Sequence, residues 1–429
     1  MPGLEFVKKS IYLWFGNLVV AILGFFTFFI LTNYLGPEFY GNYSLALSII
    51  AFLSLAVYGI ISDAIIRFSH EYPIDSGYFG LKLNIFAGIT LFVILFLFAG
   101  VIESLYSKPI SLFLRITSFA FLFTPFIESF KANAIGKKAV REFTFLSLAY
   151  NFMMLLSLLM LFRFNKEAYI AAFAFLLSNI LTFFISVWNI NFFMIFSKKN
   201  LRLIKKMKLY IKEGFVFGFT RTVFFHSPLI IGGYFMDSIN LAFYSFGFSI
   251  GVQGLFTFVN AIQTLLLPFI TAAKSKDEVS NYTSVAIKLG FFVTLLLAVG
   301  ILGVLYFILP VLFPDYVLAY KYIIFIFMAF VFMNFRAPIS IFKLAERMDI
   351  LTRISIITAI FSVVTGIVLV YLWDIWGIVI SLNINVLFYC FIHLYYLKKG
   401  TNVKLSLIPN INDLRIIKMY ILLLFAKIK

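Results

Sequence analysis

The sequence is poor in charge and almost without cysteine. Only 12% of its 429 residues are charged, and Cys390 is the one cysteine. A single cysteine excludes a disulfide framework and a cysteine-rich metal site. Soluble domains are about a quarter charged and about half apolar, whereas this chain is 63% apolar and 20% aromatic. A water-soluble fold is therefore excluded, because no compact shape would hide so much apolar surface.

Motifs of nucleotide-driven and hydrolytic chemistry are also missing. The sequence has no P-loop, no dinucleotide-binding glycine pattern, no HExxH and no nucleophile elbow. An ATP-driven pump is therefore unsupported. A membrane enzyme that builds polysaccharide would need catalytic carboxylates or arginines, normally on a large external loop, and the chain offers no such loop. We expect a protein that is no enzyme and holds no cofactor.

The apolar residues come in long runs. Runs of about 20 residues match a hydrocarbon core of about 30 Å at a rise of 1.5 Å per residue. The sequence thus predicts an all-α polytopic membrane protein, whose first run is too long for a signal peptide. We expect about twelve spans, near residues 11–34, 43–66, 83–105, 110–130, 143–162, 172–195, 213–235, 240–270, 286–310, 317–341, 351–372 and 376–397.

Lysine and arginine are distributed unevenly over the connections between these spans. With an even number of spans both termini share one side, and 28 of the 35 Lys and Arg residues fall on that side, against five on the other. Because positive charge marks cytoplasmic loops, we expect a multi-pass protein of the cell membrane with both termini in the cytoplasm. The net charge of +17 then belongs to loops at the anionic inner leaflet, and not to a nucleic-acid site.

The spans divide into two halves of six. Weak correspondences, such as Tyr43-Ser44 with Tyr244-Ser245, recur after a shift of 201 residues. Two halves in the same orientation imply parallel repeats, an architecture of transporters with the site between the halves. We expect an N-lobe at 1–196, a basic cytoplasmic interfacial linker at 197–212, a C-lobe at 213–397 and a basic cytoplasmic tail at 398–429. In that tail, residues 412–429 are apolar over too short a distance to span comfortably, and we expect a surface helix.

Ionisable residues inside spans are costly and are therefore candidates for function. Arg221 lies about eight residues into its span, beside Gly214 and Gly218 at helical spacing, and Pro228 frees a backbone carbonyl near mid-membrane. The functional interpretation is a substrate-binding cation. The structural interpretation is a salt bridge between helices, or a side chain that extends to the interface.

Other polar groups in the spans leave the same choice open. Asp63 with Arg67, and Glu128 with Lys131, are local pairs or parts of an inner gate or of coupling to a Na⁺ or H⁺ gradient. Arg336 lies near the inner end of its span, where it binds substrate or reaches the interface. The uncharged polar residues that line a cavity or join helices are His226, Gln253, Asn260 and Gln263.

The first turn of the chain carries a recognisable pattern. Two lysines, Lys8 and Lys9, precede the first span, which the run 35–46 (LGPEFYGNYSLA) follows. This opening resembles the polysaccharide-lipid flippases of the Wzx type, in the multidrug/oligosaccharidyl-lipid/polysaccharide exporter superfamily. The softer parts of the resemblance are Gly59 before Arg67, Asp237 before Tyr244, the run 314–316 (PDY) and the run 376–378 (WGI).

The resemblance implies two six-helix lobes that form a V around a central cavity. It also implies a flippase that moves an undecaprenyl-pyrophosphate-linked oligosaccharide, a surface polysaccharide repeat unit such as that of O-antigen, to the outer leaflet by alternating access. Partners would be the lipid-linked glycan, an anionic inner leaflet, and the polymerase and glycosyltransferases of the same synthesis. Family members keep cations in the cavity for the pyrophosphate, and Arg221 is the mid-span residue that matches.

Two other functions remain open at this point. A multidrug exporter on the same fold would extrude organic cations and would need an anionic cavity, against which the deep charge of Arg221 argues. A membrane scaffold protein that transports nothing would leave the ionisable groups in the spans and the duplicated halves without a reason.

Overall fold

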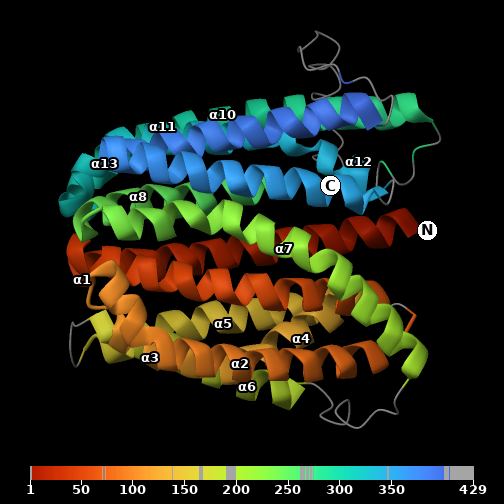
Figure 1. Cartoon of the computed structure of the whole chain (residues 1–429), viewed down its shortest axis with the longest axis horizontal. Helices are drawn as coiled ribbons and strands as arrows, with labels where there is room; N and C mark the ends of the chain where they lie inside the picture. Colours follow the sequence, from red (N-terminus) through yellow and green to blue (C-terminus); the bar gives the residue numbers. More distant parts are fainter. Residues whose placement is uncertain are drawn as a thin grey trace. The chain divides into compact units, whose positions relative to one another are not determined.

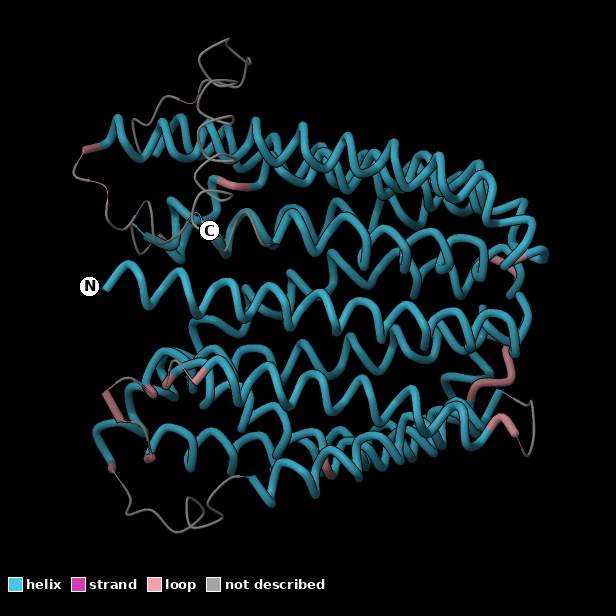
Figure 2. The backbone as a smooth tube through the Cα atoms, turned by 180° about the vertical axis from the view of Figure 1, so that it is seen from behind, coloured by secondary structure: helices cyan, strands magenta, loops and turns pink. Residues whose placement is uncertain are grey.

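The computed structural model consists of helices joined by short turns. It describes residues 2–69, 71–72, 74–137, 139–163, 168–189, 200–260, 266, 270, 273, 275–344, 347–400 and 405. No strand occurs among these residues, as Figure 2 shows by its colours. The all-α polytopic class predicted from the sequence is confirmed.

Each of the twelve predicted spans falls on helical segments in the part of the chain that the structure describes. Within the described residues, nine helices are long and apolar enough to cross a membrane, or ten when the pair Ser111–Leu122 and Thr124–Gly136, bent by 48°, counts as one span. Two of these ten, the first and the last, each join two predicted spans across a kink. At each kink a residue with non-helical dihedral angles, Gly36 or Asp374, separates the two helical arms.

The chain divides into two compact units, which are described separately. Unit 1 comprises Met1–Ser245 and Ser362–Ile378, and unit 2 comprises Phe246–Phe361 and Val379–Lys429. The helices that belong to unit 1 are α1 (Pro2–Phe68), α2 (Asp75–Tyr106), α3 (Ser111–Ser118), η1 (Phe119–Leu122), α4 (Thr124–Gly136), α5 (Val140–Leu161), α6 (Ala168–Asn189), α7 (Leu201–Phe235) and the start of α8 (Ser238–Gly251).

Helix α1 doubles back on itself at Gly36. This residue has φ +69°, in the region that glycine adopts without a steric penalty, and Pro37 then begins the second arm. Figure 1 shows the two arms side by side in red and orange-red. The second arm packs along α7 within unit 1.

Unit 2 is built on α10 and on the two ends of α13. Its elements are the π-helix η3 (Val252–Phe256), α10 (Lys276–Leu312), η4 (Pro314–Ala319), α11 (Tyr320–Phe332), η5 (Met333–Arg336), α12 (Pro338–Leu344) and the ends of α13 (Met348–Gly400). The middle of α13 belongs to unit 1 and has its kink at Asp374, with φ +50° and ψ −126°.

Helix α7 is longer than the span predicted for it. The sequence predicts a span from 213 with a separate basic helix before it, but one helix runs from Leu201 to Phe235. Its first turn is capped by Asn200, whose side chain accepts a hydrogen bond from Leu203 N at 3.2 Å. The last described helix ends at Gly400, so the surface helix expected at 412–429 lies outside the described residues.

Candidate functional site

Arg221 lies on the inward side of α7. It follows Gly214, Met207 and Leu203 by 7, 14 and 18 residues, which at 3.6 residues per turn places all four on one face. The three earlier residues are buried, yet the Arg221 side chain is exposed and makes no ion pair with any other described side chain. The face of α7 that is buried near its N-terminal end is therefore exposed at Arg221.

The second arm of α1 forms the wall beside this face. A Cβ added at Gly214 would lie 2.4 Å from Ile60 Cδ1, so α1 and α7 are in close contact on the N-terminal side of Arg221. Further along α7, His226 Nδ1 lies 3.3 Å from the buried Ser48 Oγ on α1. His226 thus joins two helices in this structure, which is one of the two interpretations of its polarity.

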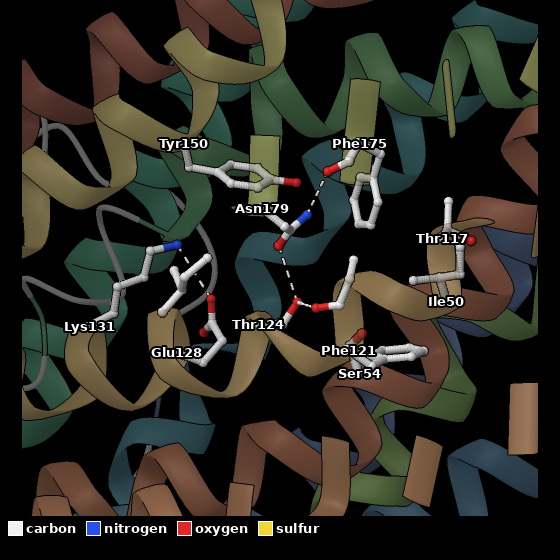
Figure 3. A pocket seen from close by; sticks show the side chains of 12 residues that line it. Ile50, Ser54, Thr117, Phe121, Thr124, Glu128, Lys131, Tyr150, Phe175 and Asn179 are labelled. Atoms are coloured by element: carbon white, nitrogen blue, oxygen red, sulfur yellow. Dashed lines mark hydrogen bonds and ion pairs between the residues drawn. The ribbon is translucent and has the colours of Figure 1, made fainter. Parts of the chain in front are cut away.

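A cavity of about 200 Å³ lies inside unit 1 (Figure 3). Glu128 and Lys131 stand at one end of it, on α4. Its lining residues come from α1, α3, η1, α4, α5 and α6, and they are Ile50, Ser54, Thr117, Ala120, Phe121, Thr124, Ile127, Glu128, Lys131, Tyr150, Phe175 and Asn179. Aromatic rings, hydroxyl groups and the amide of Asn179 line the cavity together with the charged side chains of Glu128 and Lys131. The cavity can therefore hold water and ions.

Glu128 and Lys131 form an ion pair in this cavity. Lys131 Nζ lies 3.4 Å from Glu128 Oε1 and 5.6 Å from the ring centroid of Tyr150. The side chains are 18% exposed for Lys131 and 37% exposed for Glu128, so water reaches both. Both the local-pair and the coupling interpretation remain compatible with this geometry.

Deeper in the cavity, polar groups of α4 and α6 are bonded to each other. Thr124 Oγ1 donates to Asn179 Oδ1 at 3.1 Å, and Asn179 Nδ2 donates to the carbonyl of Phe175 at 2.8 Å. Figure 3 shows Asn179 and Tyr150 on the side of the cavity opposite Glu128. The sequence pattern does not single out these two residues, because short polar groups also occur elsewhere in the apolar runs.

Asp63 and Arg67 lie near the end of α1, close to the basic turns of α7. Both side chains are exposed, and the guanidinium of Arg67 lies 5.0 Å from the ring centroid of Tyr210. The charge of Asp63 also acts on the Tyr210 hydroxyl. The structure therefore brings both charged residues to one ring on α7, a contact between helices that the pattern within α1 does not reveal.

In unit 2, Arg336 is buried. It is 7% exposed, its guanidinium lies 4.8 Å from the ring centroid of Phe256, and its Nη2 donates to Asn260 Oδ1. Phe256 ends the π-helix η3, in which Gln253 also lies, half-buried. Arg336 thus does not extend to an interface, and the predicted Arg336 and Asn260 are in direct contact.

Two further basic side chains of unit 2 were missed. His393 is 2% exposed and its Nδ1 lies 2.7 Å from the carbonyl of Tyr389, and the charge of Arg336 acts on its ring. Lys288 on α10 is 5% exposed. The remaining predicted residue, Gln263, lies outside the described residues.

Residues 6–274 match the family model described as "Polysaccharide biosynthesis protein". The chain belongs to this family. A search of curated protein sequences finds no match.

Solved structures with the same fold are flippases and exporters. The lipid II flippase MurJ, in an inward closed conformation, has a TM-score of 0.74 at 14% identity, and the match covers 90% of this chain and 87% of that one. An inward-facing MATE family multidrug transporter of the MOP superfamily has a TM-score of 0.64 at 12% identity, covering 91% and 96%. A MOP superfamily transporter from Pyrococcus furiosus, described as having a binding pocket of reverse polarity, scores 0.62 at 13% identity, covering 93% and 96%.

The structural matches confirm the fold class that the resemblance implied. In this polysaccharide biosynthesis protein, the predicted site residues are distributed over both units. Arg221, His226, Glu128 and Lys131 lie in unit 1, and Arg336 with Asn260 lies in unit 2. Their roles remain predictions.

Proposed function

We propose that this protein is a flippase, and not an enzyme, in the cell membrane. It translocates an oligosaccharide linked to undecaprenyl pyrophosphate from the cytoplasmic to the outer leaflet by alternating access. Glycosyltransferases would supply the substrate and a polymerase would consume it. Membership of a polysaccharide biosynthesis family, on a fold shared with flippases and exporters, supports this proposal.

The exposed guanidinium of Arg221 carries the proposal. A cation inside a span is costly unless it is paired or solvated. Arg221 has no ion-pair partner among the described side chains and lies on the face that is buried elsewhere along α7, away from exposed apolar residues such as Phe219. A pyrophosphate needs cations of this kind, because a guanidinium binds phosphate oxygens through two parallel hydrogen bonds. The polyprenyl tail can stay in the lipid, so only the head group has to enter a polar path.

A multidrug exporter remains the alternative. It would need anionic groups where a substrate cation passes, and the described ionisable residues of the spans include Glu128 as well as Arg221. Glu128 is paired with Lys131, however, whereas Arg221 is not paired with any described side chain. Of Glu128 and Arg221, Arg221 is therefore the one whose charge no described side chain neutralises.

Reconstituted vesicles distinguish the two functions. We expect the purified protein to move a polyprenyl-pyrophosphate-linked oligosaccharide between leaflets, measured as the fraction of labelled sugar that an impermeant oxidant reaches. Free polyprenyl pyrophosphate is expected to compete, and organic cations are not. Vesicles that move an organic cation but not the lipid-linked sugar would favour the exporter.

The ion pair of Glu128 and Lys131 is proposed as the coupling element for a Na⁺ or H⁺ gradient. Both charges line a cavity that water can fill, and their 3.4 Å contact is partly exposed, so binding of a proton or cation at Glu128 competes with Lys131. Tyr150, 5.6 Å from Lys131, gives the freed ammonium an alternative partner. A change of ion occupancy is thereby converted into a movement between α4 and α5.

Neutralising Glu128 tests this coupling. Glu128→Gln is expected to reduce gradient-driven flipping to background, because the amide cannot take up a proton or replace the carboxylate charge. Exchange of substrate without a gradient should continue. The measurement is flipping with and without an imposed ion gradient in the same vesicles.

The double variant Glu128→Gln/Lys131→Met separates coupling from simple pairing. If the pair were only structural, removing both charges would restore what one substitution loses; we expect no restoration of gradient dependence. The exposed pair of Arg347 and Asp349, with Nε and Oδ1 3.0 Å apart, provides a matched control. Arg347→Gln/Asp349→Asn is expected to retain gradient dependence.

A further inference from the structure

The turn from Met236 to Asn240, which links α7 to α8 and includes the first residues of α8, is held from three sides. Its partners are Asn42 on α1, Lys108 in the connection from α2 to α3, and Asp374 at the kink of α13, and all of them belong to unit 1. We call this turn and its three partners the outer clasp, since the charge distribution predicts that this end faces outward.

Lys108 caps the C-terminal end of α7. It is only 8% exposed, and its ammonium donates to the carbonyl of Gly233 at 2.6 Å and to that of Met236 at 2.8 Å. The last carbonyls of a helix have no partner within the helix and lie at the negative end of its dipole. A lysine from a distant connection therefore supplies both the hydrogen bonds and the charge that this terminus needs.

The contact with α1 involves the backbone as well as side chains. Ser238 Oγ donates to Asn42 Oδ1 at 2.7 Å. A Cβ added at Gly41 would lie 1.9 Å from the carbonyl oxygen of Ser238, and one added at Gly233 would lie 2.4 Å from Leu45 Cδ1. Gly41 thus allows α1 to approach the backbone at the start of α8, and Gly233 allows the Leu45 side chain to pack against the end of α7. Leu45 is completely buried in this contact.

The third side of the clasp is at the α13 kink. The amide of Asn240 donates to Asp374 Oδ2 at 3.0 Å and also to Asp237 Oδ2 at 3.1 Å. Asp374 has φ +50° with ψ −126°, a backbone conformation that non-glycine residues rarely adopt and that persists only where surrounding contacts hold it. The kink and the turn therefore depend on each other.

The opposite end of α7 lacks such contacts. Arg202, Lys205, Lys206 and Lys208 are exposed there, and none forms an ion pair with another described residue. The C-terminal end of α7 is thus capped by buried, charge-assisted hydrogen bonds, whereas the basic side chains at its N-terminal end are exposed.

We infer that the outer clasp is the closed outer gate of the transport path, and that release of the substrate requires the turn 236–240 to separate from Asn42, Lys108 and Asp374. This inference rests on the proposed transport function for its purpose. The contacts themselves, and the accessibility of the residues beneath them, are independent of which substrate is moved.

A reversible cross-link tests whether the clasp opens during transport. Asn42→Cys and Ser238→Cys are introduced together in a Cys390→Ser background, since their side chains already meet. Oxidation to the disulfide is expected to reduce flipping to background, and dithiothreitol is expected to restore it. Each single cysteine variant should be insensitive to the same treatment. Full activity of the oxidised, cross-linked protein would show that the clasp is a fixed structural cap.

Labelling of a residue beneath the clasp tests the gate without any substrate. In Cys390→Ser protein, Leu45→Cys is exposed to an impermeant maleimide from outside. Adding Lys108→Met should raise the labelling rate about tenfold or more, which corresponds to about 1.4 kcal/mol, because the variant loses both charge-assisted hydrogen bonds to α7. Asn240→Ala, which removes only the link to Asp374, should raise it less.

The matched control is Lys321, an exposed lysine predicted to lie on the same side, whose Nζ lies 4.9 Å from the ring centroid of Tyr322. Lys321→Met should leave labelling at position 45 unchanged. Unchanged labelling in both the Lys108→Met and the Asn240→Ala proteins, at normal levels of folded protein, would overturn the gate. If labelling rises as expected but vesicles move no lipid-linked sugar, the gate stands and the proposed substrate is wrong.

Discussion

Arg221→Ala is expected to abolish flipping of the lipid-linked oligosaccharide while the protein still accumulates in the membrane. Unit charges 4 Å apart attract each other by about 4 kcal/mol at an effective dielectric constant of 20. Because the Arg221 side chain is exposed, water screens part of this attraction. Even half of the attraction corresponds to a factor of about thirty, so flipping should decrease at least about thirtyfold. The measurement is complementation of surface glycan display, with the membrane level of each variant determined alongside.

Two further substitutions define what Arg221 does. Arg221→Lys should retain part of the activity, since an ammonium attracts phosphate but cannot form the paired hydrogen bonds of a guanidinium. Lys212→Ala, nine residues earlier on α7 and also exposed, is the matched control and should display glycan normally. Normal display by the Ala variant at position 221, at wild-type membrane levels, would exclude Arg221 as a substrate contact.

Gly377→Ala is expected to reduce the amount of folded protein severely. A Cβ at this position would lie 1.9 Å from the carbonyl oxygen of Leu369, 2.3 Å from its carbonyl carbon and 2.7 Å from the nitrogen of Val370. All three are backbone atoms of the preceding arm of α13, so no side chain can rotate to make room. Overpacking of a rigid site costs about 1–3 kcal/mol or more, a large part of the stability of most proteins. Thermal unfolding followed by size-exclusion chromatography measures the loss.

Gly303→Ala is the matched control for that substitution. Gly303 also lies within a long helix, α10, but a Cβ there would meet nothing within 4 Å. Alanine is intrinsically favoured over glycine in a helix, so the melting temperature should stay the same or rise slightly. If the two alanine variants unfolded alike, the close backbone approach at Gly377 would not matter to stability.

The sequence predicts the spans well because a bilayer requires continuous apolar runs, and it predicts helix ends poorly because local capping sets them. The span predicted at 286–310 belongs to α10, which begins at Lys276. The ten extra residues are helical because Ser275 accepts a hydrogen bond from Glu278 N at 3.2 Å, a serine and glutamate spacing that begins helices. Asn200 extends α7 in the same manner, into turns that a hydropathy pattern assigns to a surface linker.

Side-chain partners from other helices are what the sequence could not supply for the candidate site. The depth of Arg221 and the spacing of Glu128 and Lys131 are visible within single helices, and both were selected. Asn179 became part of a cavity only through Thr124, 55 residues earlier. Lys108 is one of the five cations that the sequence predicts on the external side. Its partners are backbone carbonyls 125 and 128 residues away, and the sequence does not reveal them because every residue has a backbone carbonyl.

The continuity of α7 has a mechanical consequence. Thirty-five residues at 1.5 Å each make a rod of about 52 Å, which exceeds the hydrocarbon thickness by roughly 20 Å. Five of its basic residues, from Arg202 to Lys212, lie near its N-terminal end, and the C-terminal end is capped by Lys108. No loop lies between the two ends, and Pro228 interrupts the hydrogen-bond ladder. A force on the basic N-terminal end of α7 is therefore transmitted to its C-terminal end as a tilt of the helix. Pro228 sets where the helix can bend.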